Sequence, residues 1–196
     1  DKVLHRLIST GKFKCVVIDA PFVNVSTSCI GVDHRRAQYE VAAKTVMENN
    51  CKRILYIAGK RNGYVTDERI RGMEDLVKEK NLTMLVRNGE FSELQARNIT
   101  LKYAKNKDIV VCASDLMAIG AMKALIQMDI FRPVCGFDGI ILMGYVGKQM
   151  NTVRQDFASI SESAMEELQE LMNGGYGRNI VMKHSLVRMK YEDIIA

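Results

Sequence analysis

One stretch of the chain predicts its fold class. A short run of strand formers at 109–113 leads directly into residues 115–127, which are nearly all good helix formers. An apolar strand without polar alternation is typical of a parallel sheet that is covered on both faces. The helix is apolar on nearly every side, which predicts that it packs on its own sheet and on a second surface. Asp115 is expected to cap this helix by accepting from its first amide groups.

The alternation of strand and helix extends well beyond this stretch. From residue 53 to residue 138 the pattern is β-α-β-α-β-α-β. Right-handed crossovers then predict an α/β protein with a doubly wound parallel sheet. Two capping boxes, Ser92 with Gln95 and Ser159 with Glu162, predict helix starts near 92 and 157. Further helices are expected at 1–10, 35–50 and 66–80, further strands at 13–19, 29–33, 151–155, 179–182 and 186–191, and irregular structure at 139–150.

Composition narrows the class of protein. With 196 residues, 47% of them hydrophobic and 26% charged, the chain forms one large domain or two lobes with a core. The net charge is +5 and the basic residues are scattered, so no nucleic-acid stripe is expected. Five cysteines without a CxxC pair predict free buried thiols in a reducing compartment, the cytoplasm. No apolar run is long enough to cross a bilayer and no signal peptide stands out, so no membrane partner is expected.

Polar side chains gather at the carboxyl ends of the expected strands. Asp19, Ser114 and Asp138 each follow or end an apolar run, and Arg69 lies near the start of a helix after a glycine-containing strand exit. Open parallel sheets bind ligands at this edge. Carboxylates accept from hydroxyls and the arginine fork donates in a fixed plane, so this set suits a neutral, hydroxyl-rich ligand.

Each of these residues also has an ordinary structural interpretation. Asp138 fits a turn, Arg69 a solvated helix charge, and Asp19 the end of a strand. Only their joint placement at strand ends favours a ligand site.

Catalytic and metal-binding patterns are missing from the sequence. There is no GxSxG, no GxxxxGK[ST] and no HExxH. The three histidines, at 5, 34 and 184, are widely spaced and fit surface or lobe-boundary positions. The glycines at 174–177 follow a helix, which is the wrong context for phosphate binding. We therefore expect no enzyme, no metal site and no cofactor.

Three motifs, taken in order, resemble a known family. They are residues 111–121 (VCASDLMAIGA), 133–138 (PVCGFD) and 151–157 (NTVRQDF), with a helix start at 68–72 (ERIRG). In this order and spacing they resemble the effector-binding core of the lactose-repressor/galactose-repressor (LacI/GalR) family. Each motif alone is a weak signal, but the ordered set is a strong one, and the likeness covers nearly the whole chain.

The resemblance implies an α/β, two-lobed, periplasmic-binding-protein-like type I fold with doubly wound parallel sheets. The implied N-terminal lobe consists of 1–32 and 156–184, and the C-terminal lobe of 33–155 and 185–196. Against the family pattern the first lobe is incomplete and the helix-turn-helix headpiece is absent. We therefore expect a fragment of a longer repressor.

The resemblance also implies a function. A sugar or sugar derivative would bind in the cleft between the lobes and change the affinity of the parent protein for operator DNA, which only the headpiece contacts. Arg69 would clamp ligand hydroxyls, Asp138 would accept from them, and Phe157 would stack on the ligand. The implied ligand contacts are Asp19, Arg69, Ser114, Asp138 and Phe157.

A homodimer is implied as well, formed through helix 115–127 and the segment 142–145. Three alternatives remain open from the residues. An exported sugar-binding protein of a transporter would share the fold, although five unpaired cysteines argue against it. A hydrolase-like enzyme would need an activated nucleophile. A protein that keeps only dimerisation is suggested by Ser114, where the family usually has Asn, and by an altered stretch at 148–152.

Overall fold

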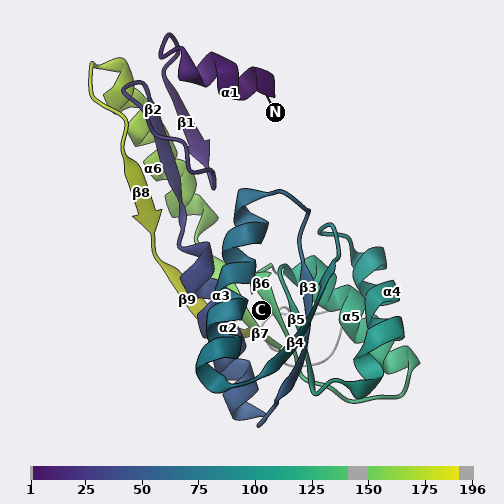
Figure 1. Cartoon of the computed structure of the whole chain (residues 1–196). Helices are drawn as coiled ribbons and strands as arrows, with labels where there is room; N and C mark the ends of the chain where they lie inside the picture. Colours follow the sequence, from purple (N-terminus) through teal and green to yellow (C-terminus); the bar gives the residue numbers. More distant parts are fainter. Residues whose placement is uncertain (1, 141–149, 190–196) are drawn as a thin grey trace. The chain divides into compact units, whose positions relative to one another are not determined.

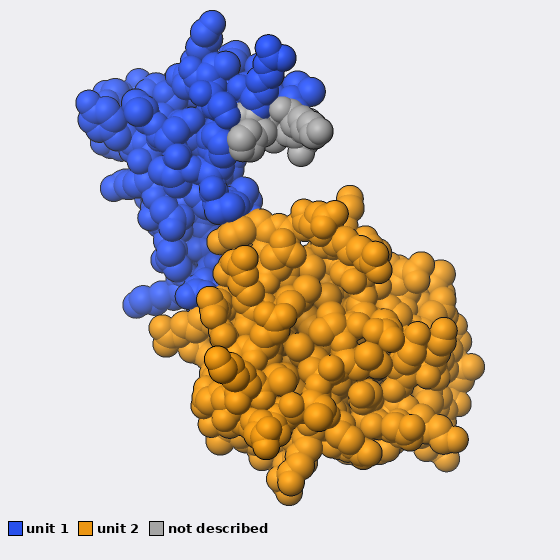
Figure 2. Space-filling view, in the orientation of Figure 1, with its two compact units in different colours: residues 1–33, 156–184 blue, residues 34–155, 185–196 orange. Residues whose placement is uncertain are grey.

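The chain divides into two compact units. The computed structural model describes residues 2–140 and 150–189. Unit 1 comprises 1–33 and 156–184, and unit 2 comprises 34–155 and 185–196 (Figure 2). Most of the segment expected to be irregular, and the predicted dimer contact at 142–145, lie outside the described residues.

Unit 1 is a small parallel sheet with one long helix packed on it. The strand order is β1-β2-β8, and both neighbouring pairs are parallel. Helix α6 packs on β1 and β2, and its buried Ile160 and Leu171 join Cys29, Ile30 and Val32 in the core. The elements are α1 (Lys2–Ser9), β1 (Cys15–Ile18), β2 (Thr27–Val32), α6 (Phe157–Met172) and β8 (Asn179–Met182).

The start of α6 differs from the expected capping box. Asp156 is the cap: its carboxylate accepts from the Ser159 amide at 3.0 Å and from the Ser159 hydroxyl at 2.7 Å. Ser159 is therefore the third residue of the helix. The ionised Asp156 carboxylate is a stronger acceptor than the Ser159 hydroxyl, so it takes the capping position. The other expected cap is confirmed, since the Ser92 side chain accepts from the Gln95 amide at the start of α4.

Unit 2 is the doubly wound sheet that the alternation predicted. Its strand order is β4-β3-β5-β6-β7-β9, with parallel pairing from β4 through β7. Figure 1 shows α2 and α3 on one side of these strands and α4 and α5 on the other. The elements are α2 (His34–Glu48), β3 (Arg53–Ala58), α3 (Tyr64–Lys80), β4 (Thr83–Asn88), α4 (Glu93–Tyr103), the 3-10 turn η1 (Ala104–Asn106), β5 (Ile109–Cys112), α5 (Asp115–Gln127), β6 (Val134–Asp138), β7 (Met150–Gln155) and β9 (His184–Met189).

Helix α5 has the two packing surfaces that its apolar character predicts. One is the sheet, through β5 and β6, and the other is α4. Gly120 allows α4 to approach, because a Cβ at that position would lie 2.1 Å from the Glu93 carbonyl oxygen. Gly72 has the same role between α3 and α2, where a Cβ would lie 2.2 Å from the Arg35 carbonyl oxygen. Among the described residues, no helix is long and apolar enough to cross a bilayer.

Candidate functional site

The candidate site lies at the carboxyl edge of the unit 2 sheet. Strand β5 ends just before Ser114, β6 ends at Asp138 and β7 ends at Gln155. Because these strands are parallel neighbours, their carboxyl ends share one edge. Arg69 reaches this edge from α3, where its Nη1 donates to the carbonyl oxygen of Ala113.

Arg69 is buried, so the expectation of a solvated helix charge is wrong. The residue is 3% exposed, and its guanidinium carbon lies 3.5 Å from the centroid of the Phe137 ring. Its Nη2 lies 3.2 Å from Nδ1 of His34 and 3.8 Å from Oδ1 of Asp138. The planar cation is thus held by a ring face, a histidine and a carbonyl, and it faces a carboxylate.

Asp138 is the acceptor of this arrangement and has an unusual backbone. Its φ is +116°, a value that side-chain-bearing residues rarely adopt and that costs on the order of 1–3 kcal/mol. Burial raises the pKa of the Asp138 carboxyl, while Arg69 and the Gln155 amide, which donates at 3.1 Å, oppose the rise. Strain of this kind persists where the surroundings fix it, and it concentrates at functional sites.

Ser114, and not Asp115, caps α5, while the predicted ligand contact of Ser114 stays a prediction. Ser114 caps α5 by accepting from the Met117 amide at 3.3 Å, so the expected cap by Asp115 is wrong. The Asp115 carboxylate instead accepts from the Thr152 hydroxyl at 2.6 Å and from the Ile140 amide at 2.9 Å. Asp115 is the first residue of the helix, which points its side chain at β7 and the end of β6 rather than back along its own turn.

The two remaining predicted contacts belong to unit 1. Asp19 follows β1 with a φ of +53°, and its amide donates to the Ile30 carbonyl at 2.9 Å. Gly31 leaves room for the carboxylate, since a Cβ there would lie 2.3 Å from Asp19 Oδ1. Phe157 is the first residue of α6 and is 54% exposed. Their contact with a ligand stays a prediction.

Three residues of the site were missed by sequence reasoning. His34 was expected at a surface or lobe boundary; it is the first residue of unit 2, and its side chain is buried, at 2% exposure. Phe137 is buried completely beneath Arg69. Gln155 ends β7, so the strand-end rule that selected Asp138 also applies to it. His34 follows the end of β2 by two residues, so the strand-end rule could have placed it at a sheet edge but not beside Arg69.

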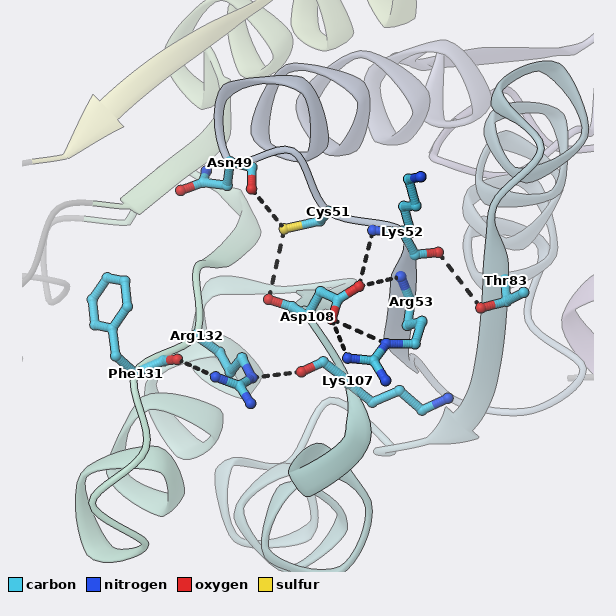
Figure 3. A network of polar contacts seen from close by, with 9 residues as sticks. All are labelled: Asn49, Cys51, Lys52, Arg53, Thr83, Lys107, Asp108, Phe131 and Arg132. Atoms are coloured by element: carbon cyan, nitrogen blue, oxygen red, sulfur yellow. Dashed lines mark hydrogen bonds and ion pairs between the residues drawn. The ribbon is translucent and has the colours of Figure 1, made fainter.

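A second polar network lies at the opposite edge, around Asp108 (Figure 3). The Asp108 carboxylate accepts from the amides of Lys52 and Arg53 at 3.0 and 2.8 Å. It also accepts from Nε and Nη2 of Arg53 at 3.0 and 2.6 Å, and these contacts hold its pKa well below its usual range. This network joins the starts of β3 and β5, so its role is structural.

A cavity of about 420 Å³ lies near this second edge, beside the starts of β6 and β7. Its polar side chains are paired with each other. Asn151 Nδ2 donates to Glu48 at 2.8 Å, and Arg188 lies 2.5 Å from Glu48 and donates to Asn151 at 3.1 Å. Hydrogen bonds from Lys44 and Asn151 lower the pKa of Glu48 to about 2. Within the described ranges, no group of three or more His, Cys, Asp or Glu side chains is arranged to hold a metal ion.

Comparison with known proteins gives a consistent result. A family model for the periplasmic binding protein-like domain matches residues 43–191. The HTH-type transcriptional regulator MalR of Clostridium butyricum is 28% identical over 171 residues, which cover 82% of this chain and 51% of MalR. The chain spans about half the length of the curated relatives it matches.

Solved structures share the fold. The transcriptional regulator CelR in its cellobiose complex has a TM-score of 0.76 at 22% identity, covering 82% of this chain and 53% of CelR. A transcriptional regulator LacI from Bacillus cereus subsp. cytotoxis has a TM-score of 0.86 at 19% identity, covering 97% of this chain and 72% of that one. These matches confirm the expected fold. The chain belongs to the periplasmic binding protein-like domain family, and its resemblance to LacI-type regulators is confirmed by the relatives it matches.

Proposed function

We propose that this chain is the effector-binding part of a cytoplasmic, LacI-type DNA-binding transcriptional regulator, and that it senses a sugar or sugar derivative. MalR is a transcriptional regulator, and CelR was solved with cellobiose, so both halves of the proposal have a precedent among similar proteins. These relatives, together with five free cysteines, favour a regulator over an exported sugar-binding protein of a transporter.

The observation that carries the proposal is the Arg69–Asp138 arrangement. Arg69 is fixed by Phe137, His34 and the Ala113 carbonyl, so it needs little reordering when a ligand arrives. Asp138 keeps about a quarter of its side chain exposed and supplies the acceptor. A donor fork next to a carboxylate acceptor matches hydroxyl groups, which both donate and accept, and its balanced charge suits a neutral ligand.

Regulation would follow from a difference in effector affinity between two states of the intact protein. An effector shifts an equilibrium only by its differential affinity for the two states. The coupling between effector and operator DNA is expected at about 1–3 kcal/mol, roughly a five- to 150-fold change in operator affinity.

The regulator is also proposed to act as a homodimer through α5. Leu116 and Ile126 on this helix are about half exposed although they are apolar, and a twofold dimer would match a palindromic operator. Ile126→Lys should convert the dimer to monomers in sedimentation. A variant that sediments like the wild type would count against this surface.

Thermal unfolding of the intact protein against a panel of sugars, sugar phosphates and nucleosides tests the effector. A ligand at 100 times its Kd adds about 2.7 kcal/mol to the free energy of unfolding. A shift in Tm with one class, lost in Arg69→Lys and Asp138→Asn, is the expected result. Arg71→Lys and Asp75→Asn are matched controls at exposed ion pairs, and they should keep the shift.

Two further variants test the contacts predicted from the resemblance. Asp19→Asn and Phe157→Leu should each weaken the response to the same compound. If a folded, dimeric protein shows no shift with any compound of the panel, the effector proposal fails and a protein that only dimerises is the better account.

A further inference from the structure

A second buried carboxylate adjoins the site and is not used by the contacts proposed above. Asp115 is completely buried, and each of its oxygens has a partner. Oδ1 accepts from the Thr152 hydroxyl at 2.6 Å, and Oδ2 accepts from the Ile140 amide at 2.9 Å. Burying a carboxyl group is costly unless its oxygens are matched in this way, so the arrangement is specific.

These two bonds join three segments that are distant in sequence. Asp115 begins α5, Thr152 lies in β7, and Ile140 follows β6. Residues 138–140, in which Asp138 and Gly139 have positive φ values, are called the turn. The turn starts at Asp138, the acceptor of the candidate site. Asp115 is therefore the side chain that connects the body of the sheet to the turn carrying that acceptor.

The turn needs such a restraint. Asp138 and Gly139 are consecutive residues with φ values of +116° and +71°. A non-glycine residue in this conformation is held there only when its surroundings over-determine the backbone. The amide of Ile140, two residues on, is fixed by Asp115, and the Asp138 carboxylate accepts from Gln155.

Two glycines make room for this geometry. At Gly136 in β6, a Cβ would lie 2.2 Å from Oδ1 of Asp115. At Gly139, a Cβ would lie 2.8 Å from the Arg154 Cα. The motif Gly136-Phe-Asp-Gly139 thus accommodates the Asp115 carboxylate at its first residue and the turn at its last.

We propose that Asp115 is a positioning residue for effector binding: through the Ile140 amide it holds the turn that presents the Asp138 carboxylate opposite Arg69. This inference rests on the proposed role of the Arg69–Asp138 pair as the ligand site. Asp115 acts through Asp138 and does not itself touch the effector.

Two substitutions of Asp115 test whether its hydrogen bond to the Ile140 amide, and not its charge, holds the turn. In Asp115→Asn, the carbonyl oxygen accepts from the Ile140 amide and the NH₂ donates to the Thr152 hydroxyl, which is able to accept. The turn is then kept. In Asp115→Ala both bonds are lost. Ser92→Ala is the matched control, because it removes another helix-start hydrogen bond in unit 2, at α4.

The first measurement needs no effector. Amide hydrogen exchange at Ile140, followed by NMR in the intact protein, should be slow in the wild type, in Asp115→Asn and in Ser92→Ala. It should be at least about tenfold faster in Asp115→Ala. An unchanged Ile140 rate in Asp115→Ala overturns the proposal.

The second measurement is the Kd for cellobiose and for D-ribose, by calorimetry. Asp115→Ala should weaken binding by about 10- to 100-fold, the range found for side chains that orient metal-binding groups. Asp115→Asn and Ser92→Ala should stay within about threefold of the wild type. Equal losses in the Asn and Ala variants would overturn the role of the hydrogen bond. A wild type that binds nothing in the wider panel counts against the proposed function instead, and the exchange rates still decide what Asp115 does.

Discussion

The guanidinium of Arg69 stacks on the face of Phe137, 3.5 Å from the ring centroid, and both side chains are almost wholly buried. The ring of His34 lies 5.8 Å from the same Phe137 ring, and its Nδ1 lies 3.2 Å from Nη2 of Arg69. Desolvated stacking of this kind is worth about 2 kcal/mol or more. Arg69 is therefore oriented by the protein before any ligand arrives.

Phe137→Leu should loosen this orientation. The substitution keeps an apolar side chain but removes the ring face, so we expect a loss of about 2 kcal/mol in the free energy of unfolding. Effector affinity should fall together with stability, because Arg69 loses the surface that orients it. Ile109→Val is the control: it trims a buried side chain in β5, so it should lower stability by about 1 kcal/mol and leave Kd unchanged. Urea unfolding and calorimetry measure the two quantities, and equal Kd values for the two variants would contradict the prediction.

The Asp115 carboxyl should make stability depend on pH near neutrality. Burial raises its pKa from 3.8 to about 7, although bonds from Thr152 and Ile140 oppose the rise. The charged side chain that raises this pKa further is Asp138 at the end of β6.

Between these two pKa values, the folded state holds a proton that the unfolded state has released. The contribution of Asp115 to the free energy of unfolding is therefore complete below about pH 4 and is lost as pH rises to about 7. This contribution is at most about 4 kcal/mol. Asp115→Asn should flatten the curve of unfolding free energy against pH from 5 to 8. The same slope in both proteins would show that Asp115 is not the titrating group.

Asp108 should stabilise unit 2 in the opposite pH range. Contacts with Arg53 and two backbone amides lower its pKa, so its contribution is present above about pH 4 and is lost as pH falls below that value. Asp108→Ala should cost about 2–3 kcal/mol at pH 7, as expected for hydrogen bonds to a charged group. Asp75→Ala is the contrast, because its pair with Arg35 is about half exposed and is worth about 0–1 kcal/mol. Similar losses of unfolding free energy in the two variants would show that the Asp108 network stabilises the fold no more than an exposed ion pair does.

Local sequence predicted the boundaries of helices and strands well where the segment is mostly apolar and buried. Strand β3 (Arg53–Ala58) begins, and helix α5 (Asp115–Gln127) begins and ends, where expected, since apolar residues dominate both elements. The roles of polar residues at the edges were harder to predict. Asp115 could satisfy its carboxylate on its own helix or on Thr152, 37 residues away, and only the fold decides between them.

The same limit explains the missed histidine. His34 meets Arg69 across 35 residues of sequence, and no local pattern reports that contact. Asp138, by contrast, was found because the end of a parallel strand is a local feature with a spatial meaning. Strand ends therefore predicted part of the site, while the contacts that hold Arg69 in place required the structure.

Gly120→Ala should destabilise unit 2 although alanine favours helices by about 1 kcal/mol over glycine. The added Cβ would lie 2.1 Å from the Glu93 carbonyl oxygen, a backbone atom that cannot rotate away, so α4 and α5 must separate. The packing loss is about 1–3 kcal/mol and should outweigh the gain in propensity. Urea unfolding is the measurement, with Ser163→Ala on α6 as a helix substitution without such a contact. If Gly120→Ala were as stable as the wild type, the close approach of α4 and α5 would be wrong.

Since Leu116 and Ile126 lie on the same helix, displacing α5 should also weaken the proposed dimer, which sedimentation of the variant measures independently.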